Sequence, residues 1–201
     1  MTQSSKREQL IQAALELFNK NGFHAVGIDA ISERAGVTKK TLYHHFKSKE
    51  ELILAVLRYR DERFRNDLMR SVEARAESPA GRLLAIFDVA EELFKQDDYY
   101  GCLFVGAMHE YPDPGTPIRH MCREAKGLLH DYIKDLAEKA QLKQPGPLSE
   151  QLALLLEGAI TMAQVNNSPL SAVQAQKAAE VLIQNSQTSV HQNTEVNISQ
   201  P

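Results

Sequence analysis

Apolar residues recur every three or four positions along nearly the whole chain, and this spacing indicates helices that bury one face. Within residues 5–23 the repeat is carried by Leu10, Ile11, Ala14, Leu17 and Phe18. The glycine at position 22 predicts the end of this first helix. No segment alternates between apolar and polar residues as a half-buried strand does, and no internal repeat occurs. The pattern predicts an all-α protein.

Two short helices are expected next, over residues 28–35 and 39–46, with a sharp turn at Gly36 between them. Thr38 suits the N-cap of the second of these helices. Ser48 and Glu51 have the spacing of a capping box and predict the start of a long helix. That helix meets no proline or glycine before the segment SPAG at residues 78–81, so it would be about 43 Å long at 1.5 Å per residue.

The rest of the chain is predicted to be helical as well, over residues 79–96, 102–111, 149–164 and 169–185 and in a segment that Pro117 opens. The segments PDPGTP and KQPGPLS are expected to interrupt it. We divide the chain into residues 1–50, residues 51–188 and a tail of residues 189–201, whose polar, aperiodic sequence predicts disorder.

The two short helices have the dimensions of a helix-turn-helix, in which the second helix enters the major groove of DNA. Four apolar residues would face inward, namely Ile31, Ala35, Leu42 and Phe46, and Val37 would fill the gap between the helices. Lysine can bind a phosphate or guanine, threonine and tyrosine can bind phosphates, and histidine can meet a base edge. The residues predicted to contact DNA are Thr38, Lys39, Lys40, Thr41, Tyr43, His44 and Lys49.

The distribution of charge agrees with this prediction, although the net charge is −3. Residues 1–50 hold eight lysines and arginines against five aspartates and glutamates, whereas the remainder holds 15 against 21. A basic first quarter would orient the molecule toward a polyanion. An ordinary solvated helix face is the other interpretation of the lysines. His45 could pack against the first helix or touch DNA, and His24 is expected to be exposed.

The segment from Gly22 to Leu52, GFHAVGIDAISERAGVTKKTLYHHFKSKEEL, resembles the DNA-binding domain of the tetracycline-repressor (TetR/AcrR) family of bacterial regulators. The resemblance covers about the first quarter of the chain. It implies a repressor that binds a near-palindromic operator in double-stranded DNA as a homodimer and is released by a small-molecule effector. The family often has two hydroxyl residues where Val26 and Gly27 stand here, so a phosphate contact at this point would fall to a backbone N–H.

Composition and motifs disfavour other classes of function. Hydrophobic residues make up 43% of the 201 residues and charged residues 24%, as in a globular protein with a full core. The chain begins without the apolar segment of a signal peptide, and no apolar run approaches the roughly 20 residues of a membrane span. We therefore expect a cytoplasmic protein with no membrane partner. No nucleophile elbow, phosphate loop or Rossmann motif supports the rival interpretation of an all-helical enzyme, and no cofactor is expected.

The sequence gives little indication of a metal site or of a redox-active cysteine pair. Five potential metal ligands, His109, Glu110, Asp113, His120 and Cys122, show no recognised ligand spacing, so no metal site is predicted. Cys102 and Cys122 could form a redox pair across two helices, or could simply be small buried residues.

The last two predicted helices have small and apolar residues on more than one side, and a helix with two apolar sides needs two partners. One partner is intramolecular, and in the family that this chain resembles the second is the same helix pair of another subunit. The residues predicted for this dimer interface are Gly158, Ala159, Ala163, Ala175, Ala178, Ala179 and Leu182.

A pocket for the effector is predicted around residues 99–111, where aromatic and polar residues accompany helix-weakening glycines. The residues expected to line it are Phe87, Phe94, Tyr100, Phe104, Met108, His109, Glu110, Met121 and Tyr132. The same residues would suit an ordinary core. A helical DNA-binding protein without an effector would have this space filled, so a cavity distinguishes the two alternatives.

Overall fold

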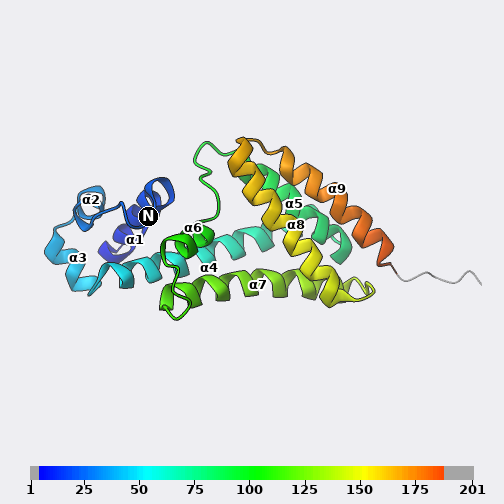
Figure 1. Ribbon diagram of the computed structural model, residues 1–201, viewed down its shortest axis with the longest axis horizontal. Helices are drawn as coiled ribbons and strands as arrows, with labels where there is room; N and C mark the ends of the chain where they lie inside the picture. The colour runs from blue at the N-terminus through cyan, green and yellow to red at the C-terminus, as the bar shows by residue number, and fades with distance from the viewer. Residues whose placement is uncertain (1–4, 188–201) are drawn as a thin grey trace, which may run out of the picture.

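The computed structural model describes residues 5–187, and every regular element in that range is a helix (Figure 1). The helices are α1 (Lys6–Asn21), α2 (Ile28–Arg34), α3 (Lys39–His45), α4 (Lys49–Arg75), α5 (Pro79–Phe94), α6 (Leu103–Glu110), α7 (Pro117–Lys139), α8 (Pro145–Asn166) and α9 (Leu170–Asn185). The all-α class is confirmed. The tail predicted over residues 189–201 lies outside the described residues.

The molecule is elongated, with α1–α3 at one end and α5, α8 and α9 packed together at the other (Figure 1). We call α1–α3 the headpiece and α5–α9 the body. The long helix α4 starts at the headpiece and continues into the body, where it packs against α5 and α7. Its 27 residues make it about 40 Å long, close to the length predicted from the sequence.

Thr38 and Ser48 cap α3 and α4, as their positions in the sequence predict. The Thr38 hydroxyl accepts a hydrogen bond from the Thr41 N–H at 3.1 Å, and the Ser48 hydroxyl accepts one from the Glu51 N–H at 3.2 Å. The Glu51 carboxylate accepts from the Lys47 N–H at 2.7 Å, one residue earlier than in a standard capping box. These bonds satisfy N–H groups that have no partner within the helix, and so fix where α3 and α4 begin.

Helix α8 begins at Pro145, four residues before its predicted start. Pro145 and Pro147 both lie in the first turn, where a backbone N–H has no acceptor within the helix, so proline costs no hydrogen bond there. The Ser149 hydroxyl, expected near the start of the helix, instead donates to the Gly146 carbonyl at 2.7 Å. The interruption predicted for KQPGPLS is therefore confined to the short connection between α7 and α8.

The buried apolar residues form two clusters. The headpiece cluster joins α1–α3 to the first half of α4, to α6 and to the start of α7, and includes Phe18, Leu42 and Phe104. The body cluster joins the second half of α4 to α5, α8, α9 and the rest of α7, and includes Leu68 and Phe94. Because the headpiece cluster continues past residue 50, a common core crosses the boundary predicted there.

The structure corrects the surface predicted for dimerisation. Four of the seven predicted residues are at most 8% exposed and pack within the protomer: Ala159, Ala163, Ala175 and Ala179. They are buried because α9 lies against both α8 and α5, and the small alanine side chains allow a close approach of these helices. Leu182 is half-buried against the same cluster, whereas Gly158 and Ala178 are exposed.

Candidate DNA-binding surface and effector cavity

Buried apolar side chains hold α3 against the rest of the headpiece. Ile31, Leu42 and Phe46 are at most 1% exposed. The turn between α2 and α3 depends on Gly36, whose φ of 65° lies in the left-handed region that glycine adopts without strain. The next residue, Val37, packs half-buried against the same cluster, and its N–H donates to a carbonyl of α2 at 3.0 Å. The predicted helix-turn-helix is therefore confirmed.

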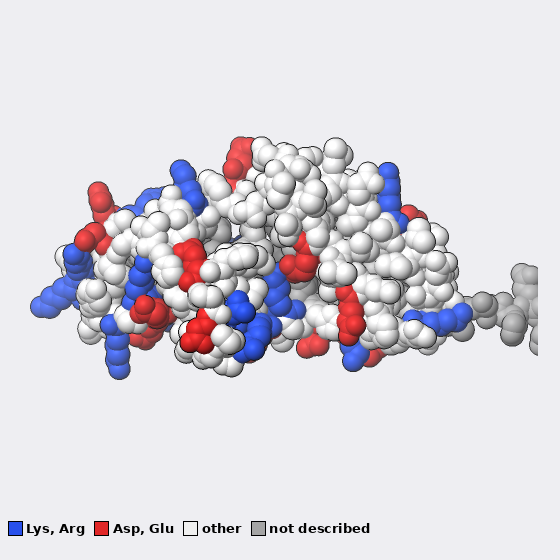
Figure 2. All heavy atoms as spheres, in the orientation of Figure 1, with Lys and Arg blue, Asp and Glu red and all other residues white. Residues whose placement is uncertain are grey.

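The polar residues predicted to contact DNA lie on the headpiece and, in the case of Lys49, at the adjoining start of α4. Lysine and arginine side chains project outward at this end of the molecule (Figure 2). Five of the seven are exposed: Thr38, Lys39, Lys40, Tyr43 and His44. The half-buried Thr41 shares a 3.0 Å hydrogen bond with the Thr38 hydroxyl, and the half-buried Lys49 donates to the His24 carbonyl at 3.4 Å. The arrangement suits phosphate and base contacts, and the individual contacts remain predictions.

Several charges of the headpiece are paired with each other. The Lys39 ammonium lies 2.5 Å from the Asp29 carboxylate, and Arg34 lies 2.6 Å from Glu16. All four side chains are more than half exposed, and exposed ion pairs are weak. Asp29 therefore competes with a DNA phosphate for Lys39 without preventing the contact. His45 is half-buried.

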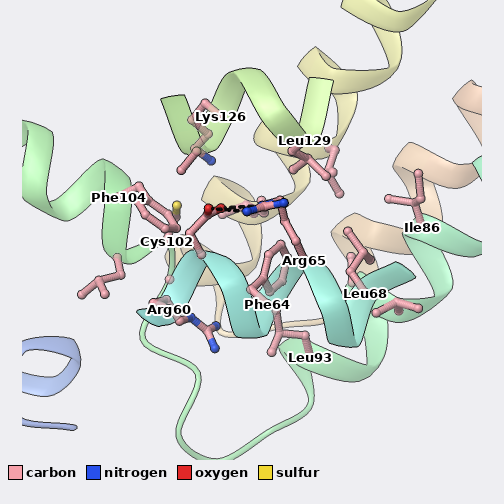
Figure 3. Close-up of a pocket in the computed structure, with 18 of the residues that line it drawn as sticks. Arg60, Phe64, Arg65, Leu68, Ile86, Leu93, Cys102, Phe104, Lys126 and Leu129 are labelled. Carbon is pink, nitrogen blue, oxygen red and sulfur yellow. Dashed lines mark hydrogen bonds and ion pairs between the residues drawn. The ribbon is translucent and has the colours of Figure 1, made fainter. Parts of the chain in front are cut away.

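A cavity lies where the headpiece cluster meets the body cluster, between α4, α5, α6, α7 and α8 (Figure 3). The cavity has a volume of about 80 Å³ and opens to solvent. Its apolar walls come from both clusters and include Leu68, Ile86, Phe94, Leu103, Phe104 and Leu156. Concave apolar sites with few polar groups are typical of small-molecule binding.

Four charged side chains also line the cavity: Arg60, Asp61, Arg65 and Lys126. Arg65 donates two hydrogen bonds to Asp61, at 3.0 and 2.9 Å, and this pair raises the pKa of Arg65 (Figure 3). Lys126 donates to Glu157 at 2.5 Å. The Arg60 guanidinium carbon lies 5.4 Å from the centroid of the Phe64 ring, and burial lowers the pKa of Arg60.

Two of the nine residues predicted for the pocket, Phe94 and Phe104, line this cavity. Three others pack into the apolar clusters away from it: Phe87, Met121 and Tyr132. Tyr100 and His109 are exposed because they point to the solvent side of their segment. Met108 lines an adjoining hollow between α6, α7 and α8, and Glu110 binds the headpiece instead.

The residues of α4 that line the cavity were not predicted from the sequence. They are Arg60, Asp61, Phe64, Arg65 and Leu68. A signal was present, because Phe64 and Leu68 are the apolar residues of a polar stretch and stand four positions apart, on one side of a helix. Asp61 and Arg65 have the same spacing, which places an ion pair beside these two residues.

Glu110, at the end of α6, connects the body to the headpiece. Its carboxylate accepts hydrogen bonds from the N–H groups of Phe23 and His24, at 2.7 and 2.6 Å, and lies 3.3 Å from the His24 imidazole. The approach requires glycine at position 22, because a Cβ there would lie 2.8 Å from a carboxylate oxygen of Glu110 and the φ of 81° is left-handed. His24 is exposed, as predicted, and Glu110 fixes its backbone to α6.

Comparison with known proteins agrees with the headpiece geometry. The family model for bacterial regulatory proteins of the tetR family matches residues 10–56, which span α2, α3 and parts of α1 and α4. The chain carries a TetR-family DNA-binding domain. The HTH-type transcriptional regulator YjdC of Escherichia coli (strain K12) is 29% identical over 181 residues, covering 89% of this chain and 93% of YjdC. The HTH-type transcriptional activator FasR of Mycolicibacterium smegmatis is 53% identical over 57 residues, covering 28% of this chain and 26% of FasR.

The likeness to TetR-family proteins extends beyond the headpiece. A TetR-family transcriptional regulator from Streptomyces coelicolor has a structure that matches with a TM-score of 0.83 and 27% identity, covering 90% of this chain and 95% of that one. These relatives are transcription regulators. The protein is therefore a DNA-binding transcription regulator, with a helix-turn-helix domain of the TetR family followed by a helical body similar to that of the Streptomyces coelicolor regulator.

The body has an exposed apolar face on α8 and α9. Its large members are 47–73% exposed: Leu154, Met162, Val165, Leu170 and Val181. Three of them, Leu154, Met162 and Val165, belong to α8. Together with Gly158 they recur every three or four positions, so they lie on one side of α8, opposite the side that packs on α9. Figure 2 shows that much of the surface over α8 has no charged side chain.

The two thiols of the protein have different surroundings. Cys102 is half-buried and lines the cavity beside Lys126 (Figure 3). Cys122 is fully buried in the headpiece cluster, and burial raises the pKa of its thiol to about 11. Within residues 5–187 no three histidine, cysteine or acidic side chains are grouped closely enough to hold a metal ion. None of the described helices has the length and apolar character needed to span a membrane.

Proposed function

We propose that the protein is a homodimeric repressor that binds a near-palindromic operator in double-stranded DNA and is released when a small molecule enters the cavity. It acts in the cytoplasm, where a bacterial regulator meets its DNA. We expect it to catalyse no reaction, since its relatives regulate transcription.

The observation that carries this proposal is the position of the cavity between the two apolar clusters. Two helices reach from its walls to the headpiece. Helix α4 lines the cavity around Phe64 and presents Lys49 at its other end. Helix α6 lines it at Phe104 and holds the headpiece through Glu110. A ligand between the clusters would therefore move the two helices that position α3.

The cavity also bears on the rival function, a helical DNA-binding protein without an effector. Such a protein gains stability by filling the space between its clusters with side chains, because an apolar void loses packing contacts. A cavity lined by twenty residues, four of them charged, favours the sensor.

Dimerisation is supported by the exposed apolar face of α8 and α9 and by the geometry of operators. Two recognition helices must reach successive major grooves about 34 Å apart, which one headpiece cannot do. A closed two-fold dimer buries such a face on both copies and places the two α3 helices symmetrically. The operator should therefore be a near-palindrome.

The proposal is tested on DNA that flanks the gene. A footprint should cover two half-sites related by symmetry. The double variant Tyr43→Phe/Lys49→Ala should bind all operator sequences more weakly by a similar factor, because these residues position the protein on phosphates. Changing Lys39 or His44 should instead alter sequence preference. Unaltered operator affinity in the double variant would refute the assigned surface.

A further inference from the structure

The charged side chains that line the cavity indicate which chemical class of effector it binds. We infer that the effector is an amphipathic organic monoanion, whose acid group lies beside Arg60 and whose apolar part lies along α4 and α5. This inference rests on the proposed sensor function and specifies its ligand.

Two of the three cations at the cavity already have a carboxylate. Arg65 is held by Asp61 through two hydrogen bonds, and Lys126 is held by Glu157. Burial lowers the pKa of Lys126, but Cys102 and Glu157 raise it by more, so this amine stays protonated. Each pair is neutral as a unit. The remaining charge of the lining is the single positive charge of Arg60.

Arg60 has no anionic partner of its own. Within the described part of the chain no carboxylate forms an ion pair with it, and Asp98 and Asp67 act on it only from a longer distance. Its one close partner is the face of Phe64. Burial lowers the pKa of Arg60, because it removes water from around the charged guanidinium. A guanidinium in this position binds a carboxylate with two parallel hydrogen bonds.

Lys126 and Arg60 lie toward one end of the cavity, and the Asp61–Arg65 pair lies between them and the other end. Figure 3 shows Cys102 between Lys126 and Arg60 on one side, with Leu68 and Ile86 on the other. The apolar wall is formed by Phe64, Leu68, Ile86, Val89, Leu93 and Phe94. The Tyr99 hydroxyl, another polar group of the lining, donates to the Ile160 carbonyl at 3.2 Å and is already satisfied. An alkyl or aromatic body fits this wall, and a single acid group fits the other end.

The experiment compares ligands that share a body and differ in the head group. Calorimetry is used because the chain has no tryptophan to report binding. The probes are decanoate, decan-1-ol and decylamine, and 2-naphthoate with naphthalen-2-ylmethanol and its amine. At least one carboxylate should bind about tenfold more tightly than its alcohol, which corresponds to about 1.4 kcal/mol for one charge-assisted contact. The amine should bind most weakly.

Two variants of Arg60 distinguish the effect of its positive charge from the effect of its side-chain shape. Arg60→Gln should abolish the preference for the carboxylate and retain binding of the alcohol, whereas Arg60→Lys should keep most of the preference. The matched control is Arg58→Gln, because Arg58 is an exposed arginine of the same helix outside the cavity. It should bind every probe as the wild type does. Thermal unfolding of each variant verifies that the fold is retained.

The outcomes are distinguishable from those of the sensor proposal. Equal affinity for carboxylate and alcohol, tighter binding of the amine, a preference that survives Arg60→Gln, or no binding of either carboxylate would each overturn the inference. Operator release is followed separately by fluorescence anisotropy of labelled DNA. Arg60-dependent carboxylate binding without release would support the anion site and refute the sensor. Release by the alcohol or amine alone would support the sensor and refute the anion.

Discussion

Lys39 is paired with Asp29 in the free protein, although its predicted role is to contact DNA. Both side chains are more than half exposed, so the pair contributes little to stability, and breaking it costs little. In a complex with DNA, Asp29 would place a negative charge near phosphates. We therefore expect Asp29 to oppose DNA binding while its ion pair with Lys39 adds little to the stability of the fold.

The first prediction is that Asp29→Asn binds the operator a few-fold more tightly, since the worth of an exposed ion pair is about 0–1 kcal/mol. The gain should shrink as salt concentration rises, because the removed repulsion is screened. Electrophoretic mobility shifts at two salt concentrations measure both effects. Asp131→Asn, an exposed carboxylate of α7 far along the chain from the headpiece, is the control and should leave affinity unchanged.

The second prediction at this scale concerns the thiols. At pH 8 iodoacetamide should label Cys102, which lines the cavity, and leave Cys122 unlabelled. Cys122 is buried and its pKa is about 11, so few of its thiols are thiolates below that pH, and only thiolates react. Mass spectrometry after labelling locates the adducts, and Cys102→Ser should remove the fast one. Both cysteines should react in denaturant. Rapid labelling of Cys122 in the folded protein would contradict its place in the core.

At the scale of elements, α6 is the shortest connection between cavity and headpiece. Its first residues line the cavity, and its last residue, Glu110, binds two backbone N–H groups of the headpiece. A shift at one end of an eight-residue helix is transmitted to the other, because the backbone hydrogen bonds make the helix rigid. The side chain of Glu110 is therefore the place where coupling should be broken with least disturbance.

The third prediction is that Glu110→Gln accelerates amide hydrogen exchange at Phe23 and His24. The amide has one oxygen where the carboxylate offers two, so one of the two hydrogen bonds is lost and the other is no longer charge-assisted. The free energy of unfolding should fall by about 1–3 kcal/mol. Any compound that releases wild-type protein from its operator should release the variant less. Glu150→Gln, an exposed carboxylate of α8, is the matched control, and exchange rates equal to the wild type would argue against this connection.

The elements themselves were predictable where local chemistry determines them. Thr38 and Ser48 identify the starts of α3 and α4 because a cap is a contact over three residues. Inward-facing Leu42 and Phe46 follow from helical spacing in the same way. The start of α8 was missed because proline breaks a helix in its interior but not in its first turn.

The cavity and the dimer surface were less predictable because they depend on how distant helices pack. Phe87 and Phe94 lie on the same helix and have similar composition around them, yet Phe94 lines the cavity and Phe87 does not. Helical spacing identifies a side of a helix but not the neighbour that covers it. For the same reason Ala163 and Ala179 were placed at a dimer interface, whereas they pack between α8, α9 and α5 of one protomer.

At the scale of the whole molecule, the buried alanines of α8 and α9 determine which surface remains for a second copy. Replacing Ala163 or Ala179 by arginine would insert a charge into the body cluster and unfold the protein rather than dissociate a dimer. Leu154 and Val165 are 73% and 71% exposed and lie on the opposite side of α8. They can carry arginine in a folded monomer, and in a dimer they would be buried together.

The fourth prediction is that light scattering finds the wild type as a dimer at micromolar concentration and Leu154→Arg/Val165→Arg as a monomer with unchanged helix content. If the dimer neutralises about eight phosphates, the logarithm of its DNA association constant should fall against the logarithm of the salt concentration with a slope near −7. The monomer should show about half that slope and bind DNA far more weakly. Asp131→Arg on α7 is the control and should stay dimeric, because its site is exposed and belongs to neither α8 nor α9. A wild-type monomer, or a double variant that still dimerises, would show that this face is not the interface.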